Sequence, residues 1–432
     1  MKTLRQPALA YPGGLSPVST QQPGHRHAGN PSHFDRLVLN VFRNAVGNPP
    51  VEFSLWDRGD STAGNSDTLR IAFLTRRALW QTCLRPQLGF GDGFAAGEIR
   101  VEGDLIQVLT AAYRATDQSP WQQFRRRYLG WMPLPHGNSL TESRRNIAAH
   151  YDLGNAFYRL WLDPEMVYTC AYYSAATLDL AQAQTAKLEH VCRKAGLEPG
   201  MRVVEAGCGW GGLALYMARR HGVKVRALNI SREQIEYARE RAQKLGLAHA
   251  VEFIEDDYRN IVGRCDAFVS VGMLEHVGRD NFRALGRIIR RCLSPRGRGL
   301  VHSVGCNLPS PMNGWIHRRI FPGSYTPSLR EMMAVFEDSG MSVLDVENLR
   351  LHYARTLADW LQRFEQHLPE VTSMYDDYFV RAWRLYLGGC SASFSAGNLQ
   401  LFQVVFASAR NNRLPRTRAA LYGNTAPEFW EA

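Results

Sequence analysis

The feature of this sequence that most constrains its fold is a short apolar strand that leads directly into a glycine-rich loop and then a helix. Val203-Val204-Glu205-Ala206 precedes Gly207-Cys208-Gly209-Trp210-Gly211-Gly212, and a helical pattern follows over 213–220. Glycines lack a Cβ, and the N-terminus of the next helix points its N–H groups outward, so the backbone can approach a ligand closely. The pattern predicts a nucleotide-binding loop, although the glycine spacing alone is shared with dinucleotide enzymes.

Apolar strands alternate with helical segments around this loop. Strands are expected at 202–206, 223–228, 251–254, 267–271 and 299–304, and two more at 342–346 and 399–406. Such alternation is typical of a parallel sheet with helices on both faces. We therefore predict a Rossmann-like α/β fold with a seven-stranded sheet.

The length of 432 residues predicts two domains or three. Residues 1–32 are rich in Pro, Gly, Gln and His and are expected to form a disordered tail. Residues 33–120 show a helical apolar face, two alternating segments and Asp104 placed to cap a helix, which together indicate a small α+β domain. We expect a linker at 121–145. The larger catalytic domain is expected at 146–412, and a C-terminal tail at 413–432.

The charge balance favours an anionic partner. Lys and Arg number 51 against 40 for Asp and Glu, a net charge of +11 that suits nucleic acid or membrane headgroups. No apolar run reaches the roughly 18 residues of a membrane-spanning helix, and the N-terminus lacks the apolar stretch of a secretory signal, so a cytoplasmic protein is expected. The eight cysteines are scattered. This spacing argues against a zinc site or a disulfide framework, and no metal is predicted.

Basic and aromatic residues are interleaved in the linker. Five arginines lie at 125–127 and 144–145, and the aromatic residues among them are Trp121, Phe124, Tyr128 and Trp131. They fit a linker that packs on neighbouring domains, or an interfacial patch suited to anionic headgroups. Stacking on single-stranded nucleic acid would use similar residues, but no recognised nucleic-acid motif accompanies them.

Two details near the glycine loop discriminate between ligands. An NAD site would place an acid at the end of the second strand to bind the ribose, but Asn229-Ile230-Ser231 stands there. Glu205 instead lies on the first strand, where it suits the cationic amino group of a methionine moiety. The alternative for Glu205 is a solvated strand-end charge, which its apolar neighbours disfavour. Ser231 and Gln234 have the spacing of a helix-capping box, so part of their role is structural.

Five ordered motifs in the second domain carry a resemblance to a known family. They are His150-Tyr151-Asp152-Leu153-Gly154-Asn155, Tyr168-Thr169-Cys170-Ala171-Tyr172, the glycine loop, Val271-Gly272-Met273-Leu274-Glu275-His276-Val277-Gly278 and Leu399-Gln400-Leu401-Phe402-Gln403-Val404-Val405-Phe406. Over residues 146–410 the chain resembles the cyclopropane fatty acid synthase family of S-adenosylmethionine-dependent methyltransferases. The resemblance implies a seven-stranded methyltransferase sheet and a smaller N-terminal domain associated with the lipid substrate.

The resemblance also implies S-adenosylmethionine as cofactor. The positions that match the family's cofactor-binding residues are Tyr168, Thr169, Glu205, Gly207, Cys208, Gly209, Asn229, Ile230, Ser231, Gln234, Asp257 and Tyr258. Tyr258 is expected to flank the adenine. The sequence departs from the family pattern at four positions. Thr169 replaces Ser, Glu205 replaces Asp, Tyr173 replaces Trp and Asn229 replaces Thr.

The implied reaction transfers the sulfonium methyl group to a cis double bond of a phospholipid acyl chain. A bicarbonate ion then takes a proton from the added methyl group, and the carbocation closes to a cyclopropane ring. The residues that match the family's bicarbonate site are Cys170, Glu275, His302 and Tyr353. Taken singly, each has a structural alternative, such as a packed thiol or a buried histidine. Aromatic faces stabilise cations, and the candidates are Tyr168, Tyr172 and Tyr353.

Several alternatives stay open at this point. Relatives of such enzymes methylate the double bond without ring closure or methylate a soluble amine, and an inactive lipid-binding or nucleic-acid-binding protein would keep the same fold. The expected partners are unsaturated membrane phospholipids and an anionic surface at the inner face of the membrane, without nucleic acid, and a homodimer is left open. The helix expected at 281–293 offers a basic surface, although a solvated helix face is an equally good interpretation. Its arginines are Arg283, Arg287, Arg290 and Arg291.

Overall fold

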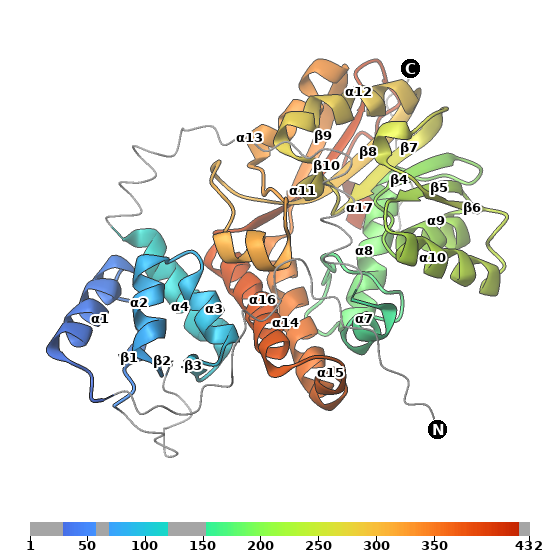
Figure 1. The fold of residues 1–432 in the computed structure, drawn as a ribbon. Helices are drawn as coiled ribbons and strands as arrows, with labels where there is room; N and C mark the ends of the chain where they lie inside the picture. The colour runs from blue at the N-terminus through green and yellow to red at the C-terminus, as the bar shows by residue number, and fades with distance from the viewer. Residues whose placement is uncertain (1–28, 58–68, 120–152, 423–432) are drawn as a thin grey trace, which may run out of the picture.

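The computed structural model describes residues 29–57, 69–119 and 153–422. Figure 1 shows a small N-terminal lobe, coloured blue to cyan, beside a larger lobe coloured green to red. The predicted linker at 121–145 lies outside the described residues. Among the described helices, none is both long and apolar enough to cross a membrane.

The larger lobe contains the predicted seven-stranded sheet, which confirms the fold class. The strand order is β6-β5-β4-β7-β8-β10-β9, and β10 runs antiparallel to both of its neighbours. Chain order reverses between β4 and β7, which is where open α/β sheets bind ligands. The strands are β4 (Arg202–Ala206), β5 (Lys224–Asn229), β6 (Val251–Glu255), β7 (Cys265–Val271), β8 (Leu293–Gly305), β9 (Met341–Asn348) and β10 (Gln400–Ser408).

Helices cover both faces of this sheet, as the alternation predicts. The helices on one face are α8 (Leu180–Ala195), α9 (Gly212–His221) and α10 (Arg232–Lys244). The opposite face packs against α12 (Phe282–Cys292), whose Phe282, Leu285 and Ile289 are buried. Two short helices, α11 (Leu274–Val277) and α13 (Leu329–Met332), lie in the connections that follow β7 and β8.

A second helical layer separates the sheet from the small lobe. Its members are α7 (Asn155–Trp161), α14 (Arg350–Gln366), α15 (Leu368–Met374) and α16 (Asp377–Ala396). Figure 1 shows α14 and α16 side by side in this layer. Three tryptophans are fully buried in it, namely Trp161, Trp360 and Trp383. The segment expected to be a C-terminal tail also differs from the prediction, because it contains α17 (Ala419–Tyr422), which packs on α8.

The small lobe has its own three-stranded sheet in the order β1-β2-β3. Its elements are α1 (His33–Ala45), β1 (Glu52–Ser54), β2 (Arg70–Phe73), α2 (Arg76–Leu84), α3 (Gly89–Ala95), β3 (Ile99–Glu102) and α4 (Leu105–Gln118). The predicted cap of α4 is present, because a carboxylate oxygen of Asp104 accepts the Gln107 N–H at 2.7 Å. The sequence did not predict α3, since three of its seven residues are glycines and only tertiary packing supports a helix there.

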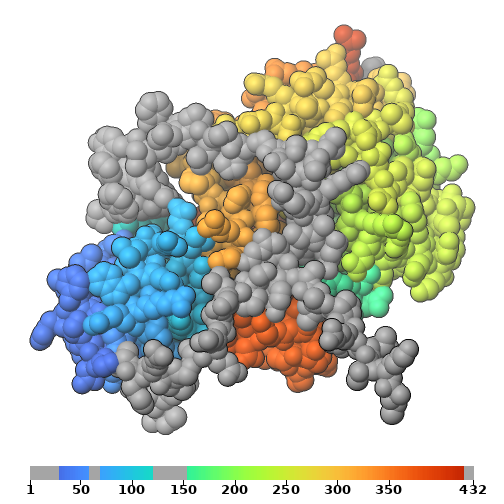
Figure 2. All heavy atoms as spheres, viewed as in Figure 1, coloured from blue at the N-terminus to red at the C-terminus, as the bar shows by residue number. Residues whose placement is uncertain are grey.

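The two lobes are joined by a tight contact around Trp315. The indole ring lies on Gly91 of α3, where a Cβ would approach within 2.4 Å of the ring. The neighbouring Asp92 accepts a bidentate pair from Arg319 at 3.0 Å for each bond, and it also accepts the indole Nε1–H of Trp315 at 3.2 Å. Arg319 belongs to one π-helical turn, η3 (Ile316–Ile320), whose orange surface meets the blue lobe in Figure 2. Glycine at 91 is therefore required for the lobes to meet.

We expect Gly91→Ala to open this contact. The added methyl group has no room beside Trp315, and overpacking of this kind costs about 1–3 kcal/mol. Calorimetry should show a lower melting temperature and a broader transition, with the small lobe unfolding first. Gly29→Ala is the matched control, because a Cβ there meets nothing within 4 Å. Equal melting curves for the two variants would contradict the prediction.

Candidate active site

A cavity of about 1300 Å³ opens at the carboxyl ends of the central strands and continues into the small lobe. Near the sheet its wall includes Gly207 and Gly272, which follow β4 and β7. In the small lobe its wall includes Phe42 of α1 and Tyr113 of α4. Single-ligand pockets usually measure roughly 300–1,000 Å³, so this cavity has room for a polar cofactor and for an apolar second ligand.

The glycine loop forms the polar end of the cavity. Gly207 has φ +84° and its Cβ would lie 2.9 Å from the Met273 Cβ, so a side chain is excluded there. The N–H groups of Gly207 and Cys208 both donate to the Leu228 carbonyl, at 2.9 and 3.1 Å, and tie the loop to β5. The helix α9 begins at Gly212, so its N-terminus faces the same space.

Asn229 at the end of β5 braces the loop. Its side-chain amide donates to Gln234 Oε1 at 2.6 Å and approaches the Gly209 carbonyl at 3.4 Å. The Ser231 hydroxyl caps α10 by accepting the Gln234 N–H at 3.4 Å. Half of the predicted capping box is therefore present, while the Gln234 side chain turns to Asn229 instead. Ser231 is buried and is not among the residues that line the cavity, so the structural part of its predicted role is present and its contact with the cofactor stays a prediction.

Glu205 is the buried acid of the polar end. Its Oε2 atom is buried without a hydrogen-bond partner, and the residue lines the cavity. Burial raises the pKa of Glu205 to about 8, although the nearby Lys187 opposes this rise. Lys187 lies on α8, lines the same cavity and donates to Thr169 Oγ1 at 3.0 Å. An unpartnered buried carboxylate at this point fits the cationic amino group of S-adenosylmethionine.

Asp257 and Tyr258 lie beyond β6 on the same wall. Asp257 is buried and caps the turn that follows it, with Oδ1 accepting the Arg259 N–H at 2.9 Å. The Tyr258 hydroxyl is buried without a partner, and the Arg259 guanidinium lies 4.9 Å from its ring centroid. A ring held in this way offers a flat surface for a heterocycle, and its contact with the adenine stays a prediction.

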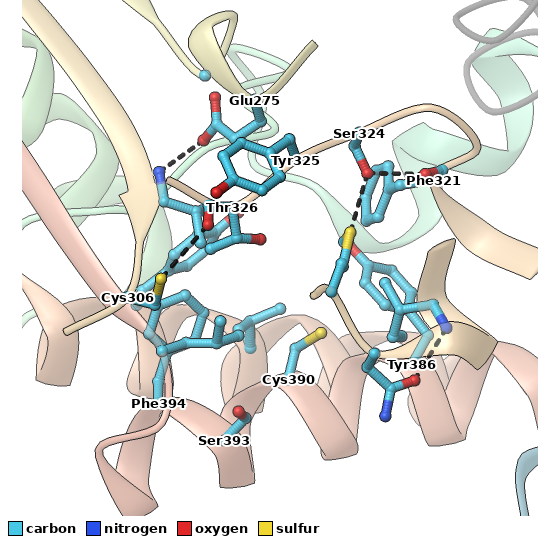
Figure 3. Close-up of a pocket in the computed structure, with 18 of the residues that line it drawn as sticks. Glu275, Cys306, Phe321, Ser324, Tyr325, Thr326, Tyr386, Cys390, Ser393 and Phe394 are labelled. Atoms are coloured by element: carbon cyan, nitrogen blue, oxygen red, sulfur yellow. Dashed lines mark hydrogen bonds between the residues drawn. The ribbon is translucent and has the colours of Figure 1, made fainter. Parts of the chain in front are cut away.

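Glu275 is the second buried carboxylate of the cavity. Its Oε1 accepts the Val304 N–H at 2.6 Å, whereas Oε2 is buried without a partner. Burial raises the pKa of Glu275 to about 7, and the bond from Val304 partly offsets the rise. Figure 3 shows Glu275 beside Tyr325, and α16 contributes Cys390 and Ser393 from the opposite side of the cavity. The carboxylate can therefore accept a proton inside a largely apolar space.

Aromatic side chains form part of the apolar wall. The Tyr168 hydroxyl lies 2.7 Å from the Tyr386 hydroxyl, and both residues line the cavity. The Tyr353 ring packs on Phe394 with 4.8 Å between the ring centroids. Tyr172 is not among the lining residues and stacks instead on the His190 ring at 4.3 Å, so its predicted role at the cation is corrected.

The structure brings only two of the four predicted bicarbonate ligands to the cavity wall. Glu275 and Tyr353 line it, while Cys170 and His302 are buried behind it. The Cys170 thiol donates to the Ala171 carbonyl at 3.1 Å, and burial raises its pKa well above the usual range. His302 Nδ1 lies 3.1 Å from Gln403 Nε2. The side chains of Cys170 and His302 therefore lie behind the wall, and a part for these two positions in a bicarbonate site, through the backbone N–H near Cys170 and through His302, stays a prediction.

Sequence reasoning missed Lys187, which is fully buried. A lysine on a helix usually indicates a solvent-facing position, and no motif marked this one. A signal was present nonetheless, because Leu180, Lys187 and Lys194 recur at seven-residue spacing on the apolar face of α8, and all three are buried. A lysine at a core position of an amphipathic helix points to a buried charge with a specific partner.

Comparison with known proteins identifies the family. The family model described as mycolic acid cyclopropane synthetase matches residues 138–404. The chain belongs to this family. It is 40% identical over 266 residues to the cyclopropane-fatty-acyl-phospholipid synthase of Escherichia coli (strain K12), which covers 61% of this chain and 68% of that protein. It is 32% identical over 392 residues to a probable fatty acid methyltransferase of Pseudomonas putida, with 86% of this chain and 96% of that protein covered.

A solved structure of the family supports the cofactor. The mycolic acid cyclopropane synthase CmaA1 complexed with SAH and CTAB is 27% identical, with a TM-score of 0.58, and the match covers 61% of this chain and 97% of that chain. The predictions of family and enzyme class are confirmed, and this member of the mycolic acid cyclopropane synthetase family is an S-adenosylmethionine-dependent methyltransferase. The family model begins its match at residue 138, so the match does not include the small lobe, which lies before that residue.

We expect Glu205→Gln to weaken S-adenosylmethionine binding about tenfold or more, since a charge-assisted bond is worth about 1.5–3 kcal/mol. In the free enzyme the pKa of Glu205 is about 8, so near pH 6 the carboxyl carries a proton that must leave when the cationic amino group binds. Affinity should therefore rise between pH 6 and 8 in the wild type. The rise should be absent in the variant.

Titration calorimetry in two buffers of different ionisation enthalpy measures the released proton directly. Glu198→Gln is the control, because it removes a surface carboxylate of the same lobe that pairs only with Arg413 among the described salt bridges. A variant that kept the wild-type affinity and proton release would overturn the assignment of Glu205.

Proposed function

We propose that this enzyme converts cis double bonds of unsaturated phospholipid acyl chains into cyclopropane rings, with S-adenosylmethionine as the one-carbon donor. One observation carries the proposal. A single cavity is lined by the glycine loop, by the buried Glu275 and by apolar residues that extend to Phe42 and Tyr113 of the small lobe. Transfer to lipid acyl chains is consistent with the names of the relatives, one a cyclopropane-fatty-acyl-phospholipid synthase and one a probable fatty acid methyltransferase.

The proposed reaction has two steps, methyl transfer and ring closure. The alkene π electrons attack the sulfonium methyl carbon, the carbon–sulfur bond breaks, and S-adenosylhomocysteine leaves with that electron pair. The adjacent chain carbon becomes a carbocation. Loss of one proton from the new methyl group then lets its C–H electrons close the ring. An alkene is a poor nucleophile, so alignment and exclusion of water carry most of the catalysis, and an apolar chamber of this kind supplies both.

Glu275 is the proposed proton acceptor, either directly or through a bicarbonate ion. Its unpartnered Oε2 can accept a hydrogen bond from the hydroxyl group of bicarbonate, and Tyr353, which also lines the cavity, can donate to that ion. The faces of Tyr168 and Tyr353 stabilise the developing cation. Cys170 and His302 support this arrangement from behind the wall.

Methyl transfer without ring closure is the second candidate, and the name of the Pseudomonas putida relative favours it. Methylation of a soluble amine is less compatible with the apolar chamber that extends to Phe42 and Tyr113. An inactive binding protein is disfavoured because both buried acids of the site are present and each keeps one buried oxygen without a partner. The two lipid reactions differ in the fate of one methyl hydrogen.

A deuterated donor separates these candidates. We expect the enzyme, given S-adenosylmethionine with a CD₃ group and a monounsaturated phospholipid, to yield a product that keeps two deuterium atoms in a ring methylene. A methyl-branched product would keep all three deuterium atoms. Mass spectrometry of the released fatty acid reads the difference. Retention of three deuterium atoms would contradict ring formation, and transfer to amines alone would contradict lipid transfer altogether.

We expect Glu275→Gln to reduce ring formation by about 10²-fold or more, as for loss of a general base, while the S-adenosylmethionine Kd stays within a few-fold. The wild-type rate should rise through pH 7, because the pKa of Glu275 is about 7 and only its ionised form accepts a proton. The variant should lack this rise. Bicarbonate should stimulate the wild type in carbonate-free buffer, and near-normal turnover of the variant would refute the assignment.

Recruitment to an anionic membrane surface is also part of the proposal, and it implies a peripheral protein at the inner face of the membrane. The predicted basic helix α12 is a weaker candidate in the structure. Arg283 pairs with Asp338 at 2.8 Å, and Arg291 donates to the Ile261 carbonyl at 2.7 Å. Both contacts favour a solvated helix face. The other candidate, Arg125 to Arg127, lies outside the described residues.

A further inference from the structure

The outer face of α1 is unusually apolar for a surface helix. Phe34, Leu37 and Val41 are 59%, 56% and 60% exposed, and their spacing of three and four residues places them on one side of the helix. Leu84, at the end of the neighbouring α2, is 74% exposed. Figure 1 shows α1 at the outer edge of the small lobe. These four side chains, which we call the α1 stripe, are the large exposed hydrophobic residues of the small lobe among the residues that the structure describes.

The α1 stripe has a basic border. Arg36 and Arg43 lie on α1, and Arg76, Arg77 and Arg85 lie on or next to α2, all of them exposed. Three of the five are paired, with Asp57, Asp35 and Glu98 respectively for Arg36, Arg76 and Arg77. Asp35 is buried, so its charge does not face outward. Over residues 1–45 the sequence has five Lys or Arg and one acid. The border is therefore complementary to an anionic surface.

The inner side of the same two helices lines the cavity. Phe42 and Val46, on or next to α1, belong to its wall, and so do Thr82 and Pro86 at the end of α2. An apolar ligand that enters beside these helices can therefore reach the glycine loop without leaving the cavity. This continuity connects the α1 stripe to the reacting centre.

We propose that α1 and the end of α2 dock on an anionic phospholipid surface, with the α1 stripe among the acyl chains and the arginines at the headgroups. The proposal rests on the proposed function, because it delivers the acyl chain of a bilayer lipid to the cavity. An apolar stripe flanked by arginines is the pattern of helices that lie in the membrane interface. It places the membrane contact on the small lobe and not on α12.

The test compares three full-length proteins, namely the wild type, a variant of the α1 stripe and a control variant. The α1 variant carries Phe34→Ser, Leu37→Ser and Val41→Ser. The control carries Leu245→Ser and Val262→Ser, which remove exposed apolar side chains from the larger lobe. Each protein is sedimented with vesicles of unsaturated phosphatidylglycerol, or of unsaturated phosphatidylcholine, at low and high salt. Methyl transfer is measured on these vesicles and on the same lipid dispersed in detergent micelles, and gel filtration reports the oligomeric state.

We expect the α1 variant to bind phosphatidylglycerol vesicles about tenfold less tightly than the wild type and to lose vesicle activity in proportion, because its apolar anchor is removed. Its activity on micelles and its cofactor affinity should stay at the wild-type level. Wild-type binding should weaken in phosphatidylcholine and in salt. The control should match the wild type throughout.

Three outcomes overturn the proposal. Undiminished vesicle binding by the α1 variant would show that the stripe does not contact lipid. A loss of vesicle binding that coincides with dissociation of a dimer would assign the stripe to a second copy of this chain. Equal losses of activity on vesicles and on micelles would show that the stripe supports the fold of the enzyme and has no specific role at the membrane. If the wild type methylates neither lipid preparation, the proposed function fails, whereas wild-type sedimentation still reports the membrane contact.

Discussion

The close packing of α16 against α4 makes the two lobes share one cavity. At Gly388 of α16 a Cβ would lie 2.8 Å from Leu105 Cδ2, so only glycine lets the two helices approach this closely. The adjacent turns of α16 carry Tyr386 and Cys390, which line the cavity. Figure 3 shows both side chains rising from this helix toward the space beneath Glu275. Since α16 both supports the small lobe and lines the cavity, the shape of the cavity depends on the position of that lobe.

The polar end of that cavity stores unfavourable electrostatic energy. Glu205 and Glu275 each have one buried oxygen without a partner, and burial raises the pKa of both. Such desolvation is costly unless a ligand completes the hydrogen bonds. A cationic amino group at Glu205 and a proton donor at Glu275 would both relieve it. The free protein is therefore less stable than its packing alone allows, and ligands that match these two carboxylates gain affinity from the difference.

Local sequence patterns predicted the parts of the fold that depend on short-range periodicity. The strands, the glycine loop and the Asp104 cap were found because each has a signature within a few residues. The layer of α14 and α16 was not, since α16 is apolar on most of its surface and shows no clear period. The site was predicted only in part, because matching a motif identifies residue types and does not establish to which side each side chain points. Along β8, alternation places His302 with Leu300 on the face covered by α8, behind the cavity wall.

His302 does not line the cavity, but it lies on β8, the strand whose backbone holds Glu275. Lys194 Nζ donates to Gln403 Oε1 at 2.7 Å, which orients the amide so that its nitrogen faces His302 Nδ1. Burial and the charges of nearby lysines lower the pKa of His302 well below its usual value, so the ring is neutral with its proton on Nε2. The ring thereby fastens β8 to β10. The backbone of β8 then connects this strand to the segment that carries Glu275. The His302 carbonyl accepts the Gly272 N–H at 2.9 Å, and the Val304 N–H donates to the Glu275 carboxylate. His302 is thus linked to Glu275 through the strand whose backbone holds the Glu275 carboxylate.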